Sequence, residues 1–166
     1  MEGAELRARQ SPLKELYRQE PASAVVVLRA EASLSDHDVA CSVQTGRALV
    51  QAGLHPATGG DGTLACSGDM LLQALVACAG VTLRAVATSR AIEVSGTIEA
   101  EGELDFRGTL GIDKGAAVGF SSIKLRFNLE SGAPADQLDQ LIATTRQYCV
   151  VLQTLASSPA LEVVRA

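Results

Sequence analysis

Four cysteines are the residues of this chain best suited to chemistry: Cys41, Cys66, Cys78 and Cys149. A thiol acts as a nucleophile when a nearby cation or a helix N-terminus lowers its pKa. No two of the four form a Cys-x-x-Cys pair. A zinc site requires Cys and His ligands clustered at short spacing, so the sequence argues against a metal site.

The two histidines offer no partner for a cysteine nucleophile. His55 precedes a proline in a turn-rich stretch, and His37 lies between two aspartates. Nothing in the sequence pairs either imidazole with a nucleophile, so we predict that both are solvated loop residues.

Composition and charge narrow the classes of function. The 166 residues fit one domain, and the net charge of -5 with no basic block argues against nucleic-acid binding. The longest uncharged apolar run, 70–83, is shorter than the roughly 20 residues of a membrane span. The N-terminal residues MEGAELRARQSPLKELYRQEP lack the apolar core of a signal peptide. We therefore predict a cytoplasmic protein with no membrane partner, whose cysteines form no structural disulfide framework.

The first third of the chain is predicted to contain a short helix and several strands. Residues 11–20 are typical of a helix, with Ser11 as the N-cap and Pro12 at the first helical position. The predicted strands cover residues 24–32, 39–45 and 48–51.

The longest predicted helix covers residues 69–90 and follows a glycine-rich connection over 55–68. The connection has neither GxxxxGKS/T nor GxGxxG, so a phosphate-binding loop is not indicated. Asp69 lies in the first turn, where the helix dipole favours an acidic side chain. Apolar residues occupy nearly every side of the helix from Met70 to Leu83. We therefore predict a helix that is buried at the centre of the domain.

Two segments with strict alternation follow this helix. In residues 92–106 the apolar side chains fall on one face and a row of acidic side chains on the other. Residues 123–129 repeat the pattern, and antiparallel pairing would place Lys124 and Arg126 near the glutamates of the first strand. Residues 107–122 form the connection.

A second helix is predicted from Pro134 through Cys149 and Leu152, and a closing strand over residues 160–164. The order of elements indicates an α+β domain. We predict a single domain over residues 1–166, in which residues 1–22 form an N-terminal extension with a short helix.

Two interpretations of the cysteines stay open at this point. Cys78 lies in the apolar helix and Cys149 in the apolar stretch YCVVLQTL, where a free cysteine commonly packs as a small hydrophobe. A reactive thiol would need a cation or a helix N-terminus beside it, which periodicity cannot locate. Cys41 alternates with two valines and is interpreted as core packing, whereas Cys66 is a further candidate for a resolving thiol.

Three segments resemble those of the OsmC/Ohr family. DMLLQALVACAGVTLRAVA is similar to the family's central-helix motif, commonly NPEELLAAALAAC followed by an apolar helix, and YCVVLQTL is similar to its second cysteine motif. VQTGRALV, with Arg47 after a predicted tight turn at Gly46, resembles the early segment that carries the family's arginine. The three matches occur in family order and cover most of the chain from about residue 23.

The resemblance implies an OsmC-like α+β fold with antiparallel sheets packed around a long buried central helix, in an intertwined homodimer. It also implies a peroxidase for organic hydroperoxides or hydrogen peroxide. Cys78 would attack the peroxide and become a sulfenic acid, Cys149 would resolve it as a disulfide, and Arg47 would stabilise the thiolate. No cofactor is implied, because an external dithiol such as a lipoyl protein would reduce the disulfide.

Two positions depart from the family pattern. Gly68 occupies the place of the family's glutamate, and Asp69 is the nearest acidic substitute. Val150 occupies the place of a proline that relatives often have, so we expect Cys149 to lie in a more continuous helix. The alternative function is a non-catalytic protein of this fold that binds a small apolar or thiol ligand. A third interpretation has the cysteines inert in the core.

Overall fold

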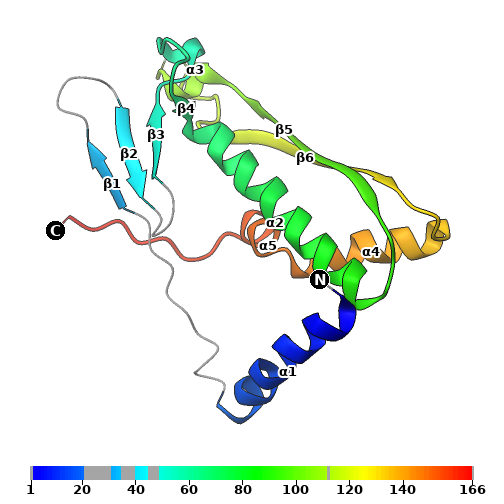
Figure 1. Cartoon of the computed structure of the whole chain (residues 1–166). Coiled ribbons are helices and arrows are strands. Elements are labelled where there is room, and N and C mark those ends of the chain that lie inside the picture. The colour runs from blue at the N-terminus through cyan, green and yellow to red at the C-terminus, as the bar shows by residue number, and fades with distance from the viewer. Residues whose placement is uncertain (1, 21–30, 35–39, 45–48, 112, 166) are drawn as a thin grey trace. The chain divides into compact units, whose positions relative to one another are not determined.

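The computed structural model of the chain describes residues 2–20, 31–34, 40–44, 49–111 and 113–165 (Figure 1). The chain forms two compact units. The first unit comprises residues 1–11, 74–100 and 125–166, and the second unit comprises residues 12–73 and 101–124.

The N-terminal helix is longer than the sequence pattern predicts. α1 spans Gly3–Gln19, and Pro12 lies inside it rather than at its first position. The prediction of a helix that starts at Ser11 is therefore wrong. A proline inside a helix removes one backbone hydrogen bond and crowds the carbonyl four residues before it, but the residues before Pro12 are mostly good helix formers.

The second unit contains a four-stranded sheet with the order β1-β2-β3-β4. Its strands are β1 (Glu31–Leu34), β2 (Ala40–Gln44), β3 (Leu49–Gly53) and β4 (Ala65–Cys66). The first three are antiparallel neighbours, and β4 pairs with β3 in parallel. Strands β2 and β3 confirm the predictions over residues 39–45 and 48–51. Most of the strand predicted over 24–32 and the turn at Gly46–Arg47 lie outside the described residues.

The glycine-rich connection has more structure than the sequence predicts. It contains the 3-10 helix η2 (Pro56–Thr58) in addition to β4. His55 caps η2, because its Nδ1 accepts a hydrogen bond from the Ala57 N–H at 3.0 Å. The His55 ring is half-buried and stacks on Phe106, with 4.8 Å between ring centroids. His55 is therefore a loop residue as predicted, although its ring is partly covered rather than fully solvated, and His37 lies outside the described residues.

The long helix α2 spans Ser67–Ser89 and is confirmed. Its fully buried residues form one stripe at a spacing of four: Leu75, Ala79, Leu83 and Ala87. Val81, on another side, is 74% exposed. The expectation of a helix that is buried on all sides is therefore wrong for the described residues of a single chain, in which one stripe of α2 is buried and Val81 is exposed.

By length and composition alone, α2 is also apolar enough to cross a membrane. The expectation of no membrane span rests on the apolar run 70–83, and the whole helix is longer than that run. The core helix of a soluble protein meets the same criterion, and α2 contributes Leu83 and Ala87 to the core of the first unit. Helix length therefore does not distinguish these two environments.

The strands β5 (Ser95–Leu104) and β6 (Phe120–Glu130) form a two-stranded sheet. Their alternation of half-buried and exposed side chains confirms the predicted pattern. Asn128 bonds to Thr97, and Ser122 bonds to Glu103. The residue numbers of the two pairs add to the same value, as antiparallel pairing requires. This register places Lys124 and Arg126 opposite acidic positions of β5, as the sequence pattern predicts.

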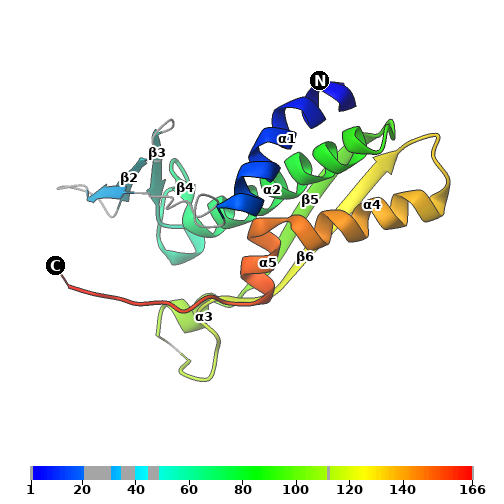
Figure 2. The same ribbon diagram turned by 90° about the horizontal axis from the view of Figure 1, so that it is seen from below.

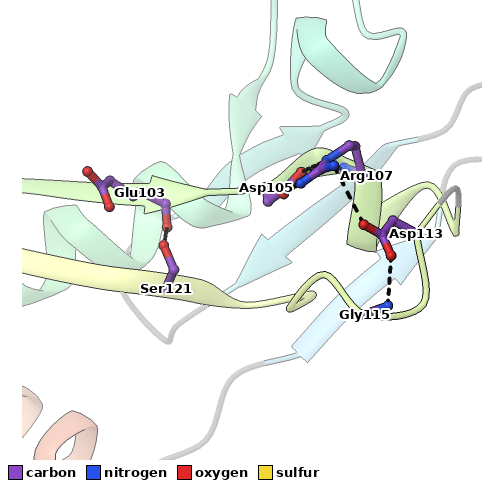
Figure 3. Close-up of polar contacts among 6 residues, drawn as sticks. All are labelled: Glu103, Asp105, Arg107, Asp113, Gly115 and Ser121. Atoms are coloured by element: carbon purple, nitrogen blue, oxygen red, sulfur yellow. Dashed lines mark hydrogen bonds and ion pairs between the residues drawn. The ribbon is translucent and has the colours of Figure 1, made fainter.

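A short helix, α3 (Phe106–Thr109), follows β5 in the second unit. Asp105 caps it, accepting from the Arg107 N–H at 3.0 Å (Figure 3). The Arg107 guanidinium also lies 2.6 Å from the Asp105 carboxylate and 3.5 Å from that of Asp113. The hydrogen bonds from Arg107 lower the pKa of Asp105. Figure 3 also shows the hydrogen bond from the Ser121 hydroxyl to the Glu103 carbonyl, which joins β6 to β5.

The core of the first unit lies where α2, the start of β5 and helix α4 (Ala135–Tyr148) meet. Its buried members are Leu83, Ala87, Val94 and Leu141. Arg84 joins α2 to the residue before β5 through a hydrogen bond to the Val94 carbonyl at 2.9 Å. As predicted, α4 follows Pro134, which precedes its first residue.

The chain ends with α5 (Val150–Ala156) and an extended segment over residues 157–165 (Figure 2). The strand predicted over residues 160–164 is wrong for the described structure, because this segment pairs with no described strand. Leu161 is 82% exposed and Val163 is 98% exposed. The segment has the composition of a strand, but a strand exists only where a neighbouring strand accepts its hydrogen bonds.

Leu141 has no exposed surface, and we expect Leu141→Ala to lower the free energy of unfolding by about 2–5 kcal/mol, because it leaves a cavity in the core. Urea denaturation followed by circular dichroism measures the loss. Leu110→Ala is the matched control, since Leu110 is 51% exposed and its truncation leaves no cavity. Equal losses in the two variants would contradict the described core.

Candidate redox site

Cys78 lies in α2 beside the buried stripe of the helix. Its neighbour Ala79 has no exposed surface, whereas the Cys78 side chain is half-buried. Thr82, one turn later, lies close enough for its hydroxyl to help lower the pKa of the Cys78 thiol. The helix therefore presents a sulfur atom that solvent reaches in part and that already has one donor.

Cys149 lies where the chain changes direction between α4 and α5 (Figure 2). Its backbone is extended, with φ -74° and ψ 106°, so this residue ends one helix and begins the next. Its N–H donates to the Thr145 carbonyl at 2.9 Å, and its carbonyl accepts from the Gln153 N–H at 2.9 Å. The expectation of a continuous helix through Cys149 is therefore wrong, because the chain breaks there although residue 150 is valine.

Side chains near the break satisfy backbone groups beside it. The Thr145 hydroxyl donates to the Leu141 carbonyl at 2.8 Å, and the Gln153 amide donates to the Arg146 carbonyl at 2.8 Å. In an unbroken helix the Arg146 carbonyl would accept from the Val150 N–H instead. The Gln153 side chain thus donates to the Arg146 carbonyl in place of the Val150 N–H.

The structure brings Cys78 and Cys149 together within the first unit, and both are free thiols. Burial by itself raises the pKa of Cys78. Hydrogen bonds donated by the Val151 N–H, the Cys149 thiol and the Val150 N–H outweigh this effect, with help from Thr82. The net result is a pKa of Cys78 below the ordinary value of a thiol, because each donor favours the thiolate.

The pKa of Cys149 moves in the opposite direction. Burial is the main cause that raises it, since the side chain has no exposed surface. The hydrogen bond to Cys78 and the negative charge there raise it further, and the N–H groups of Leu152 and Val151 only partly oppose them. The pair therefore loses its first proton from Cys78.

This arrangement combines a partly accessible sulfur that loses its proton first with a second thiol that keeps its proton longer and lies at hydrogen-bond distance. The thiolate can attack an electrophile, and the second thiol can then attack the modified sulfur to form a disulfide. Exposed apolar side chains flank both positions: Val81 after Cys78, and Tyr148 and Val150 on either side of Cys149.

The described structure does not test the other two predicted site residues, Arg47 and Asp69. Arg47 lies outside the described residues. Asp69 is exposed in the first turn of α2 and belongs to the second unit. The roles of Arg47 and Asp69 beside Cys78 stay predictions. Cys66 is half-buried in β4, and Cys41 lies in β2, both within the second unit.

Two kinds of donor lower the pKa of Cys78, and the sequence signals only one of them. Thr82 follows Cys78 by four residues, a spacing at which helix side chains meet, so this contact is readable from the sequence. The N–H groups of Val150 and Val151 carry no such signal. Every residue except proline has an N–H, and only the chain path decides where it points.

Comparison with known proteins gives a family and a fold. The family model for OsmC-like protein matches residues 60–164. A search of curated proteins found no significant match. Among solved structures, the chain is similar to an OsmC-like protein from Mycoplasma pneumoniae, with a TM-score of 0.66, 16% identity, and coverage of 80% of this chain and 89% of that one.

Two further solved structures are similar to this chain. One is an organic hydroperoxide resistance protein OsmC from Legionella pneumophila, with a TM-score of 0.60, 16% identity, and coverage of 81% of this chain and 92% of that one. The other is the organic hydroperoxide resistance protein OhrB of Bacillus subtilis, with a TM-score of 0.52, 17% identity, and coverage of 81% and 94%. These likenesses confirm the OsmC-like fold predicted from the sequence.

The lowered pKa of Cys78 predicts the pH dependence of its alkylation. Only the thiolate reacts with iodoacetamide. The alkylation rate of Cys78 is therefore highest above its pKa and falls as the pH drops through that pKa. We expect a midpoint for Cys78 below that of an ordinary thiol, and a midpoint for Cys149 above it. Timed alkylation over a pH series, read by peptide mass spectrometry, measures both.

Thr82→Val tests the cause of the lowered pKa, because it removes one donor near the Cys78 sulfur and keeps the side-chain shape. It should move the Cys78 midpoint to higher pH. A Cys78 midpoint equal to that of the urea-unfolded chain would contradict the described contacts.

Proposed function

This chain belongs to the OsmC-like protein family, and from that premise we propose that it is a thiol-dependent peroxidase that reduces organic hydroperoxides or hydrogen peroxide. The observation that carries the proposal is the contact between Cys78 and Cys149, whose pKa values are shifted in opposite directions. Similar structures that are named organic hydroperoxide resistance proteins support the same chemistry.

In the proposed reaction the Cys78 thiolate attacks the distal oxygen of the hydroperoxide. The O–O bond breaks, the alkoxide leaves as an alcohol after taking a proton, and Cys78 becomes a sulfenic acid. The Cys149 sulfur then attacks the Cys78 sulfur, the S–O bond breaks, and water leaves as the disulfide forms. An external dithiol reduces this disulfide and is itself oxidised to a disulfide.

Oxidation of Cys78 prepares Cys149 for its step. Two of the causes that raise the pKa of Cys149 are its hydrogen bond to Cys78 and the negative charge there. A sulfenic acid carries no charge, so the charge effect ends once the peroxide has reacted. The resolving thiol thus becomes easier to ionise only when there is a sulfenic acid to resolve.

The other expected participants belong to the same proposal. Arg47 would hold its guanidinium beside the Cys78 thiolate and polarise the peroxide, since this group keeps its charge where water is excluded. Asp69 would orient Arg47 in place of the family's glutamate. The enzyme would need no resident cofactor and would act in the cytoplasm, with a dithiol such as a lipoyl protein as its reductant.

A second candidate is a protein of this fold that binds a small apolar or thiol ligand without turnover. Gly68 is the observation that favours it. A Cβ at Gly68 would lie 3.4 Å from the Phe120 ring and 3.6 Å from the Cys66 sulfur, so an aromatic ring lies beside the position at which the family's sequence pattern has a glutamate. Consumption of peroxide in the presence of a dithiol, compared with that of Cys78→Ser, separates the two candidates.

A slight excess of an alkyl hydroperoxide should convert the reduced protein to a form with a Cys78–Cys149 disulfide, because the two sulfurs are already in contact. Peptide mass mapping under non-reducing conditions identifies the bond. Cys149→Ser should instead accumulate a sulfenic acid on Cys78 that dimedone traps.

Cys66→Ser is the matched control for the disulfide experiment, since Cys66 lies in the second unit and should be dispensable for the reaction. If both Cys78 and Cys149 stay reduced under this treatment, the peroxidase proposal is wrong.

We also propose that the protein is a homodimer. Exposed apolar side chains support it, because they lack cover in the single chain: Val81 at 74%, Leu161 at 82%, Val163 at 98% and Val164 at 74%. A second copy of this chain would remove such surface from water, at roughly 25 cal/mol per Å². Residues 158–165, which include Leu161, also make no backbone hydrogen bond to another described residue, so another chain could pair with them.

Sedimentation equilibrium should give a mass twice the 17.2 kDa of one chain. The double variant Leu161→Asp, Val163→Asp should weaken the association at least tenfold, because it places two charges in the proposed contact. Val118→Asp is the control, since Val118 is 65% exposed but lies in the second unit. A wild-type mass of one chain at all concentrations would contradict the dimer.

A further inference from the structure

Helix α4 is anchored in the core up to the break at Cys149. Its fully buried residues, Leu141 and Thr145, are four residues apart, and Cys149 continues that spacing with no exposed surface. Leu141 shares the core cluster of the first unit with Leu83 and Ala87 of α2. Burial in this cluster therefore fixes the α4 side of the break relative to α2.

Helix α5 lacks such an anchor. None of its seven residues is fully buried, and its N-cap residue, Cys149, makes no side-chain capping bond. A helix of this length is too short to be stable by itself. Val151 and Leu152 are half-buried, so the direction of α5 depends to a larger extent on polar contacts across the break.

The Gln153 side chain joins α5 to α4 directly. Its amide donates to the Arg146 carbonyl at 2.8 Å, a bond that spans the break and ends in the last turn of α4. The backbone bonds of Cys149 each join this residue to one helix. Its N–H donates to the Thr145 carbonyl, and its carbonyl accepts from the Gln153 N–H, both at 2.9 Å. Among the described residues, the Gln153 side chain therefore supplies the hydrogen bond that connects the two helices across Cys149.

A bond across the break restrains the backbone of Cys149. The angle between α4 and α5 depends on the two torsions of this residue, φ -74° and ψ 106°. A disulfide forms only when the two Cβ atoms are about 3.5–4.5 Å apart. A drift in these torsions would therefore lower the fraction of molecules in which Cys149 can bond to Cys78.

We propose that Gln153 is a positioning residue for the disulfide between Cys78 and Cys149, because its bond to Arg146 holds the break in the shape that the disulfide requires. For its effect on peroxide turnover this inference rests on the proposed function. Its effect on the equilibrium between dithiol and disulfide does not, since a small disulfide can also oxidise the pair. Gln153 acts through the path of the backbone rather than by contact with either sulfur.

Equilibration with dithiothreitol measures this effect without peroxide. The Cys78 thiolate attacks the oxidised, cyclic form of dithiothreitol and opens its S–S bond, and the Cys149 sulfur then displaces reduced dithiothreitol as the protein disulfide forms. The two protein thiols thus give two electrons and two protons to the reagent. Peptide mass mapping after an acid quench, over a series of ratios of reduced to oxidised dithiothreitol, gives the equilibrium constant.

Gln153→Met removes the donor and keeps the length of the side chain. The break must then be ordered as the disulfide forms, so the equilibrium constant for the disulfide should fall about threefold to tenfold, the range expected for one hydrogen bond. A tenfold fall equals a rise of about 30 mV in the reduction potential of the pair. Gln147→Met is the matched control, because Gln147 is also exposed and its side chain bonds to no described residue across the break.

A purely structural role predicts a different result. A residue that only stabilises the fold contributes equally to the reduced and the oxidised protein. Its loss lowers the free energy of unfolding, which urea denaturation measures, and leaves the disulfide equilibrium unchanged. Unchanged equilibrium constants in the folded Gln153 variants, or equal falls in Gln153→Met and Gln147→Met, overturn the inference.

Gln153→Asn provides a second variant, which keeps the amide but shortens the side chain by one methylene. It should lose the bond to the Arg146 carbonyl and lower the equilibrium constant as Gln153→Met does. If Gln153→Met does not fold by circular dichroism, Gln153→Asn decides alone.

The dithiothreitol measurement separates this inference from the proposed function. A protein that consumes no hydroperoxide but shows the fall in Gln153→Met would contradict the peroxidase proposal and keep the positioning role. An active peroxidase whose disulfide equilibrium is the same in Gln153→Met and wild type would do the reverse.

Discussion

A backbone N–H group that is removed from water must find another acceptor, and this requirement organises the region around Cys149. The chain leaves helical geometry at a residue whose side chain has no exposed surface. The N–H groups released there help to lower the pKa of Cys78 and partly oppose the rise in the pKa of Cys149. Because a thiolate accepts a hydrogen bond better than a thiol does, the bonds that satisfy the backbone also favour ionised Cys78. Chain path and thiol chemistry thus depend on the same contacts.

Packing within the first unit keeps these contacts in place. Leu141 and Thr145 of α4 are fully buried, and Leu141 shares a core cluster with Leu83 and Ala87 of α2. Ala79 and Ala87 combine complete burial with small side chains, which allows close packing against α2. Anything that separates α2 from α4 would also withdraw the α5 amides from Cys78. The stability of this core and the ionisation of Cys78 are therefore linked.

Periodicity predicts α2, β5 and β6 correctly because each has one face in the core of this chain. It fails at residues 160–164, where strand composition meets no partner strand among the described residues. It also fails at Cys149, since apolar residues continue at helical spacing on both sides of a break made by one change in ψ. Residue types identify the two cysteines, but the backbone donors around them depend on that same change and have no signature in the sequence.

Exposure and ionisation favour the same order of events in the proposed reaction. Cys149 has no exposed surface and a raised pKa, so attack by this residue would require a peroxide to reach a protonated sulfur inside the core. Cys78 is half-buried and has a lowered pKa, so it is the better placed of the two thiols to attack first. A pair of inert core cysteines would need neither the asymmetry nor the donors, because burial alone raises the pKa of both thiols. The donors at Cys78 are what distinguish this site from ordinary apolar packing, and they act on the sulfur that a peroxide can reach.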